Sequence, residues 1–149
     1  HHCNHMAFDC DLGEGYGLVF TGDHVMGWST SIVSPPDGDL TQFMESCATL
    51  LARPARLYLP GHGPAIEAPH ARLDWLVAHR LQREAAILAA LGEGPADAGT
   101  LAARVYTDTP AQLLPAAARN VLAHLIDLTG KSRVLPEGPL TAQSVFRLP

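Results

Sequence analysis

Leu18-Val19-Phe20-Thr21-Gly22-Asp23-His24 is the stretch that decides the fold of this chain. Three β-favouring residues predict a buried strand, and Gly22 lets the backbone turn so that Asp23 lies at the end of that strand. A second segment has the same form, because a strand over 56–59 is followed by Pro60-Gly61-His62-Gly63-Pro64. Carboxylate oxygen and imidazole nitrogen are ligands of zinc and iron, so the two segments together indicate a hydrolytic metal site.

The composition is that of a globular protein. Of the 149 residues, 47% are hydrophobic and 17% are charged, and the net charge is -5. No apolar run approaches the roughly 20 residues that span a bilayer, so we expect no membrane partner. The three cysteines lack the spacing of a zinc knuckle and fit reduced thiols, which predicts a cytoplasmic protein. High alanine, arginine and proline usage further suggests a bacterial source.

Charge divides the chain into two parts. Residues 1–94 carry a balance of -6, whereas residues 95–149 carry +1. This difference predicts two modules, which we place at 1–91 and 92–149 with Gly92-Glu93-Gly94-Pro95 as the linker. Neither module has the strongly basic balance of a dedicated nucleic-acid binder.

The first module reads as mixed α/β structure. An apolar/polar alternation that ends at Asp9, a turn at Leu12-Gly13-Glu14-Gly15 and a strand from Tyr16 to Thr21 together predict a β-hairpin. A long loop follows from Val25 to Gly38. Asp39 caps a predicted helix that stops at Pro54, and the strand over 56–59 comes next. Pro69 then opens a helix that ends near Leu91, so strands and helices alternate as they do in layered α/β proteins.

The second module reads as a winged helix. A short helix is expected over 101–106, and a longer one opens at Thr109-Pro110 or at Pro115 and ends at Gly130. Strands over 132–135 and 144–148 close the chain. Helices followed by a two-stranded ribbon are typical of winged helices, which are relatives of the helix-turn-helix.

Three segments resemble a known family. Phe20-Thr21-Gly22-Asp23-His24, Leu59-Pro60-Gly61-His62-Gly63-Pro64 and the Arg80…Arg83-Glu84…Ile87-Leu88 helix are similar to the metallo-β-lactamase superfamily. More narrowly, they resemble its lactamase-like endoribonuclease branch, which carries a C-terminal winged helix. The resemblance implies an α/β fold: the C-terminal half of an αββα metallo-β-lactamase sandwich followed by a small winged-helix domain.

The resemblance also implies metal ligands. The family holds two divalent metal ions, usually Zn²⁺. His1 aligns with a histidine of the first metal, because a segment similar to Cys3-Asn4-His5-Met6-Ala7-Phe8 follows that histidine in the family, although the preceding Thr-Pro-Gly is absent here. Asp23 matches the carboxylate that bridges both metals, and His62 matches a histidine of the second.

The main motif of the family, His-x-His-x-Asp-His, is missing from this sequence. Only His1, Asp23 and His62 therefore have counterparts among the metal ligands of the family. We interpret the chain as the C-terminal portion of a longer hydrolase and expect it to be inactive alone. Half of a two-sheet sandwich also exposes an apolar sheet face, which favours self-association.

The resemblance implies a metal-dependent hydrolase, in which metal-activated hydroxide attacks an ester, a thioester or a phosphodiester. A small-molecule ester or thioester and an RNA phosphodiester both remain open as substrates. The alternatives are a non-catalytic winged-helix module that binds nucleic acid or protein, and a regulatory half-protein without activity. For the binding module, the sequence offers a basic face made of Arg104, Arg119, Lys131, Arg133 and Arg147.

Each site residue also has a plain structural interpretation. Asp23 is then a turn aspartate, His62 an inert loop histidine, and His1 part of a purification tag. His24, next to Asp23, could touch substrate or support a metal ligand from behind, but we expect it to be a surface histidine. We expect His124 to occupy an ordinary surface or helix position. Arg80, Arg83 and Glu84 are expected to pair along one helix face.

Overall fold

The computed structural model describes residues 5–11 and 17–149, so His1 and the predicted hairpin turn lie outside the described residues. The chain forms two compact units. The sheet unit comprises residues up to Ser31 together with Thr41–His79, and the winged-helix unit comprises Ile32–Leu40 together with Arg80–Pro149. The predicted domain boundary between residues 91 and 92 stays a prediction. No helix among the described residues is long and apolar enough to cross a bilayer.

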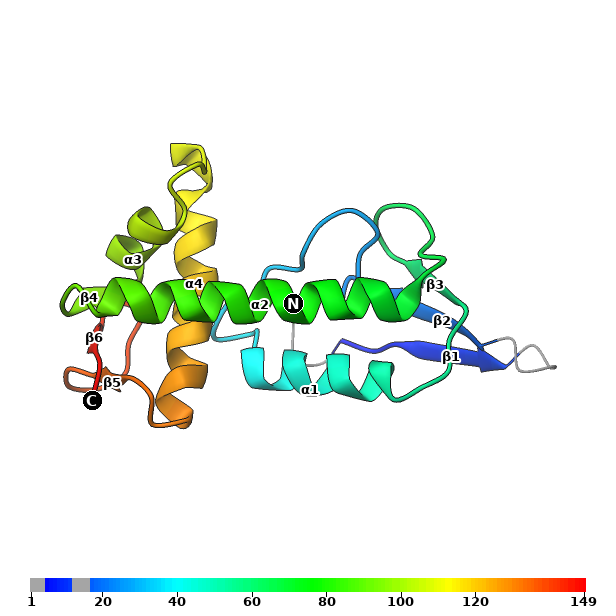
Figure 1. Cartoon of the computed structure of the whole chain (residues 1–149), viewed down its shortest axis with the longest axis horizontal. Helices are drawn as coiled ribbons and strands as arrows, with labels where there is room; N and C mark the ends of the chain where they lie inside the picture. Colours follow the sequence, from blue (N-terminus) through cyan, green and yellow to red (C-terminus); the bar gives the residue numbers. More distant parts are fainter. Residues whose placement is uncertain (1–4, 12–16) are drawn as a thin grey trace. The chain divides into compact units, whose positions relative to one another are not determined.

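The sheet unit is built on three strands (Figure 1). β1 (Phe8–Asp11) pairs antiparallel with β2 (Gly17–Gly22), and β2 pairs parallel with β3 (Leu57–Pro60). Helix α1 (Leu40–Leu51) precedes β3, and helix α2 (Pro69–Leu91) follows it. The predicted strands and helices of this part are therefore present, and α2 begins and ends where Pro69 and Gly92 predict.

One face of the sheet is buried and the other is exposed. Val19 of β2 is buried, as are Phe43 and Cys47 on the predicted apolar face of α1. Phe20 follows Val19 and lies directly opposite Phe8 in the register of β1 and β2. Because adjacent residues of a strand point to opposite faces, these two phenylalanines lie on the other face, where they are 44% and 60% exposed.

We propose that this aromatic pair drives the self-association expected from the sequence. Replacing Phe8 and Phe20 by serine removes the apolar patch without touching the buried face, so the variant should sediment nearer to the 15.9 kDa of a single chain. Sedimentation velocity at several concentrations measures this shift. A parent chain that is monomeric at every concentration contradicts the proposal.

The winged-helix unit has the expected helices and a third strand that the sequence analysis missed. It contains the second part of α2, β4 (Ala96–Asp97), α3 (Ala98–Val105), the 3₁₀ helix η1 (Ala111–Leu113), α4 (Leu114–Gly130), β5 (Leu135–Pro136) and β6 (Val145–Arg147). Its sheet has the order β4-β6-β5, with antiparallel neighbours. Only two-residue ladders form on each side of β6, which is why the observed strands are shorter than predicted.

Helix α3 begins earlier than its hydrophobic pattern indicates, and the reason is a cap. The Asp97 side chain accepts a hydrogen bond from the Thr100 backbone N–H at 2.7 Å, which satisfies one of the open donors of the first turn. The same bond holds the pKa of Asp97 below its ordinary value, because it stabilises the charged form.

The hydrophobic core of the winged-helix unit joins α2, α3, α4 and the sheet. Its buried residues include Ile87, Leu91, Leu101, Val121, Leu125, Leu128, Val134 and Phe146.

Helix α4 also makes contacts on a second side, adjacent to the side that faces this core. Asn120 Oδ1 accepts hydrogen bonds from the Val33 N–H at 3.1 Å and from Arg80 Nη1 at 3.3 Å. One turn further, His124 is only 1% exposed, and neither of its ring nitrogens has a hydrogen-bond partner among the described residues. His124 therefore has a helix position, which the sequence analysis allowed, but it is not a surface histidine, because α4 is covered on two sides.

The expectation that Arg80, Arg83 and Glu84 pair with one another along one face of α2 is also wrong. Glu84 contacts Arg133 at 2.7 Å and Lys131 at 3.7 Å. Arg83 instead donates to the Val105 carbonyl and lies over the Tyr106 ring at 4.3 Å. The side chains of α2 thus bind other elements of the winged-helix unit.

The burial of His124 makes the stability of this unit depend on pH. The pKa of His124 is lowered from 6.5 to about 3, mainly by burial and next by the nearby Arg80 charge. The Asp127 carboxylate raises this pKa, and the charges of Lys131 and Arg83 lower it further. Because the unfolded chain takes up this proton near pH 6.5 and the folded chain does not, stability is lost as pH falls from 6.5 towards 3, by about 1.4 kcal/mol per pH unit.

We therefore expect His124→Leu to flatten the pH dependence of unfolding. Between pH 7 and pH 5, the free energy of unfolding of the parent should fall by about 2 kcal/mol more than that of the variant. The reason is that the variant has no histidine at position 124 to take up a proton when the chain unfolds. Urea unfolding at the two pH values measures both losses. An identical loss in parent and variant would show that His124 is protonated in the folded state.

Candidate functional site

The structure brings Asp23 and His62 together. Asp23 Oδ1 lies 2.6 Å from His62 Nδ1, and the two side chains are 50% and 63% exposed. Asp23 comes directly after β2, and His62 follows the end of β3 by two residues. Parallel strands end at the same edge of a sheet, so this pairing places both loops on one side. The convergence expected from the sequence is present, and the role of the two residues as metal ligands stays a prediction.

Backbone hydrogen bonds join the two loops. The Gly61 N–H donates to the Gly22 carbonyl at 2.9 Å, and the Gly27 N–H donates to the His62 carbonyl at 3.1 Å. The register of β2 and β3 shifts between Phe20 and Gly22, and Gly22 has a φ of +50°, which favours glycine. This irregularity turns the chain at the sheet edge just before Asp23.

Two glycines let the loops approach this closely. A Cβ on Gly61 would lie 2.8 Å from Asp23 Oδ1, and a Cβ on Gly27 would lie 2.2 Å from the Pro64 carbonyl oxygen. Both distances are shorter than a real Cβ contact, so a larger residue at either position would force the loops apart. The Asp23–His62 contact therefore depends on glycine at positions that carry no chemistry themselves.

The loop that carries Asp23 is also tied to the rest of the sheet unit. Ser31 Oγ donates to the carbonyls of Asp23 and His24, the latter at 3.1 Å. Arg72 from α2 donates to the carbonyls of Met26 and Ser29, at 3.0 and 2.6 Å. Main-chain carbonyls of this loop are thus fixed by Ser31, further along the same loop, and by Arg72 from α2.

His24 lies behind the carboxylate and is buried, so the expectation of a surface histidine was wrong. It is 3% exposed, its ring centroid lies 4.7 Å from that of Phe43, and its Nε2 lies 3.7 Å from Cys47 Sγ. Burial, with a smaller contribution from the His5 charge, lowers its pKa from 6.5 to about 4. No sequence periodicity marks this burial, because His24 lies in a turn rather than in a strand or helix.

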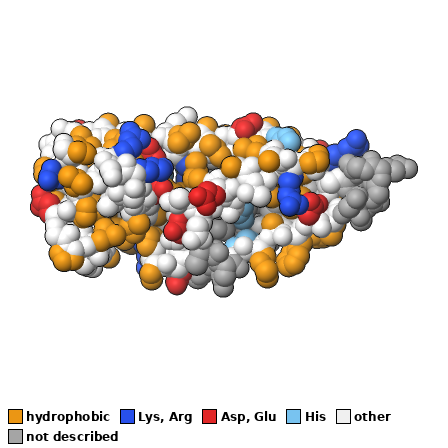
Figure 2. Space-filling model, turned by 90° about the horizontal axis from the view of Figure 1, so that it is seen from below, with side chains coloured by type: hydrophobic (Ala, Val, Ile, Leu, Met, Phe, Trp, Pro, Cys, Tyr) orange, Lys and Arg blue, Asp and Glu red, His pale blue; other side chains and the backbone are white. Residues whose placement is uncertain are grey.

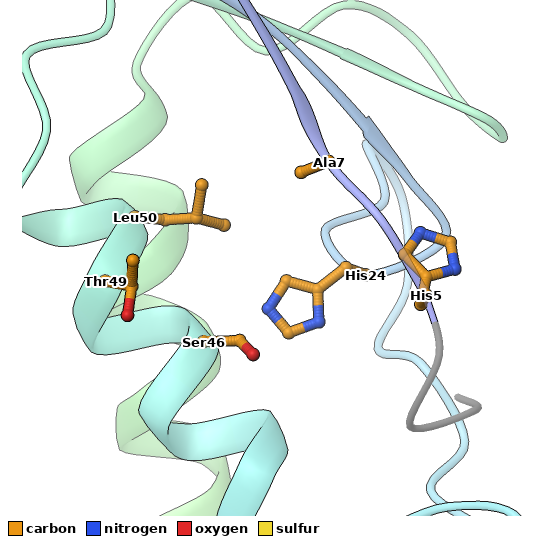
Figure 3. Close-up of a pocket in the computed structure, with 6 residues that line it drawn as sticks. All are labelled: His5, Ala7, His24, Ser46, Thr49 and Leu50. Carbon is orange, nitrogen blue, oxygen red and sulfur yellow. The ribbon is translucent and has the colours of Figure 1, made fainter.

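A small pocket opens beside His24 (Figure 3). It has a volume of about 180 Å³, and α1 lies on one side of it while the segment leading into β1 lies on the other. His5 borders the pocket, and its Nε2 lies 3.2 Å from the Thr21 carbonyl oxygen. Its other lining residues are Ala7, His24, Ser46, Thr49 and Leu50.

Asp23 and His62 offer two of the donors that a metal site needs. Among the described residues, no group of three or more His, Cys, Asp or Glu side chains converges. The third candidate ligand, His1, lies outside the described residues. The described part of the chain therefore supplies a carboxylate–imidazole pair rather than a closed metal site.

Comparison with known proteins places this chain in a family. A family model described as a beta-lactamase associated winged helix domain matches residues 98–139. The beta-lactamase-like protein 2 homolog of Drosophila melanogaster is 36% identical over 129 residues, which cover 83% of this chain and 42% of that protein. The crystal structure of a metallo-β-lactamase family protein from Thermus thermophilus superposes with a TM-score of 0.73 at 28% identity, over 90% of this chain and 42% of that one.

The chain belongs to the metallo-β-lactamase superfamily. The lactamase-like protein nscB of Trichophyton equinum is 33% identical over 105 residues, covering 66% of this chain and 30% of that protein. A beta-lactamase domain protein from Burkholderia ambifaria, at 22% identity and a TM-score of 0.77, shares the fold.

These matches confirm the family, the α/β class and the winged helix that the sequence predicted. This metallo-β-lactamase superfamily chain spans less than half the length of these relatives. Its metal, its reaction, its cellular location and its bacterial source stay predictions.

Gly27→Ala tests whether the loop contact holds the site. The added methyl group meets backbone atoms of Pro64, which cannot move aside cheaply, so we expect a loss of about 1–3 kcal/mol of stability and weaker loop contacts. Gly130→Ala is the matched control, because nothing lies within 4 Å of its Cβ position at the end of α4. Urea unfolding measures both variants, and equal stability of the two would refute the close approach.

Proposed function

We propose that Asp23 and His62 bind a divalent metal ion, Zn²⁺ in our assignment, as part of the active site of a metallo-β-lactamase-type hydrolase. The observation that carries this proposal is the 2.6 Å approach of Asp23 Oδ1 to His62 Nδ1 at the edge of the sheet. Family membership supports a hydrolase fold.

The chemistry of the pair fits a metal ion. A carboxylate and a neutral imidazole are both zinc ligands, and a carboxylate can bind a different cation with each of its oxygens. Both side chains are about half exposed, so both are accessible to a metal ion from solvent. The two donors make up part of a coordination shell. His1 would be a third ligand from this chain, and we assign the remaining ligands to the portion of its relatives that this chain does not span.

A divalent ion held there would supply Lewis acidity and a water of lowered pKa, which suits the hydrolysis of esters, thioesters and phosphodiesters. The contribution of this chain would be to hold the carboxylate and the imidazole at a fixed separation. Ser31 and the backbone bonds of Gly61 and Gly27 would keep these ligands in place. Such preorganisation limits the reorganisation needed during the reaction.

The winged-helix unit supports this proposal over a nucleic-acid-binding module. In the helix-turn-helix relatives, the recognition helix lies in the major groove and reads base edges. Here the corresponding helix, α4, is buried on its core side and also at Ala123, His124 and Asp127.

The basic residues near the wing form ion pairs within the winged-helix unit. Lys131 Nζ lies 2.6 Å from Asp127 Oδ2, and Arg133 Nη1 lies 2.7 Å from Glu84 Oε1. On the face drawn in Figure 2, basic and acidic side chains are interspersed and do not gather into one basic surface. This charge pattern favours a packing or guarding role for the winged helix over phosphate binding.

The metal assignment is tested by titrating the chain with Zn²⁺ and following the His62 ring signals by NMR. With only part of a coordination shell, binding should be weak and substoichiometric. Asp23→Asn should weaken it by at least about tenfold, since even changes one shell further out from a metal commonly cost 10–100-fold.

His70→Gln provides the control, because His70 is an exposed histidine that contacts the Arg53 carbonyl at 2.9 Å rather than Asp23. This variant should bind zinc like the parent. Zinc-induced shifts of His62 that persist unchanged in Asp23→Asn would overturn the assignment, whereas tight stoichiometric binding would show that this chain supplies further ligands.

A further inference from the structure

Trp28 is a large apolar side chain that stands exposed beside the proposed metal site. Its side chain is 70% exposed, although it follows Gly27 in a loop that is otherwise closely packed against the His62 loop. A Cβ on Gly63 would lie 2.5 Å from Trp28 Cδ1, so the edge of the indole ring packs directly over the residue next to His62. Gly63 has a φ of +88°, which further restricts this position to glycine.

The turn that carries Trp28 is held on both sides. The Arg72 guanidinium donates to the Met26 carbonyl, two residues before Trp28, and to the Ser29 carbonyl, directly after it. Arg72 itself stacks over the Trp75 ring at 4.5 Å. A planar guanidinium with two bonds and a stacking contact is a stiff support, so the backbone of Trp28 is fixed although its side chain is exposed.

An exposed aromatic ring on a fixed turn costs little conformational entropy when it binds a ligand. It presents a flat apolar face and a single polar N–H, which suits stacking against another planar ring. Stacking on an aromatic side chain is favourable for every nucleobase, because each base has a flat π-face. Such a ring next to a hydrolytic centre would hold a planar group beside the bond that is cleaved.

We propose that Trp28 forms an aromatic wall of the substrate site, and that the site takes substrates with a planar aromatic group next to the hydrolysed bond. The proposal rests on the function proposed above, because it assigns the ring to the substrate of the same centre. Nucleobases and aromatic acyl groups share this chemistry, and the experiment below separates them.

The test uses the whole chain without added metal, and neutral probes that carry no scissile bond. Adenosine and benzamide are titrated separately into the protein, with ribose and cyclohexanecarboxamide as saturated controls. The Gly63 amide and His62 ring signals are followed by NMR, because a ring stacked on Trp28 shifts nearby nuclei. We expect shifts with the aromatic probes and none with the saturated ones. A larger response to adenosine than to benzamide identifies a nucleobase site, and equal responses identify a site for any planar ring.

Two variants separate stacking from general apolar contact. Trp28→Phe keeps a ring and should retain the response, whereas Trp28→Leu keeps an apolar side chain and should lower the affinity for the aromatic probes about fivefold or more. Equal affinity of the Leu variant and the parent, or equal shifts with aromatic and saturated probes, would overturn the proposal. Because no metal is present, this result is independent of the zinc titration, so the aromatic wall and the metal site can fail separately.

Discussion

The parallel pairing of β2 with β3 is the constraint on which the sheet unit depends. Two strands that run in the same direction finish at the same edge, and the residues that follow them are then neighbours although 39 positions separate them in the sequence. This pairing brings Asp23 and His62 to the same edge of the sheet. A chain with the same two loops on antiparallel neighbours would carry the same residues at opposite edges.

Close packing of the two loops then fixes the contact between Asp23 and His62. Strand pairing brings two loops to one edge, but it does not set the distance between a carboxylate and an imidazole. The missing side chains of Gly27 and Gly61 permit that distance, because a Cβ on Gly27 would meet the Pro64 backbone of the other loop and a Cβ on Gly61 would lie 2.8 Å from Asp23 Oδ1. Around this contact, Arg72 fixes the turn between Met26 and Ser29 and so links α2 to the site.

The winged-helix unit shows why a fold by itself does not define a function. Its strand order and helix sequence are those of a nucleic-acid-binding motif, yet α4 uses a second face to bind Arg80 and the Val33 backbone through Asn120. Its basic residues near the wing neutralise Glu84 and Asp127. The helix that corresponds to the DNA-reading helix of other proteins is packed here on two sides, and the function has to be argued from the side chains that remain accessible.

The sequence by itself determined the family and most of the helices and strands, because these depend on local patterns, whereas the short strand β4 was missed. Helical spacing with Pro69 and Gly92 at the ends determined α2, and an apolar strand before Gly22-Asp23 determined β2 and the position of the carboxylate. The tertiary structure alone decided which residues are buried and which charges pair. His24 and His124 resemble surface histidines in the sequence, and Glu84 resembles a partner of its own helix, because burial and ion pairing depend on what distant segments place against a side chain. No local pattern carries that information.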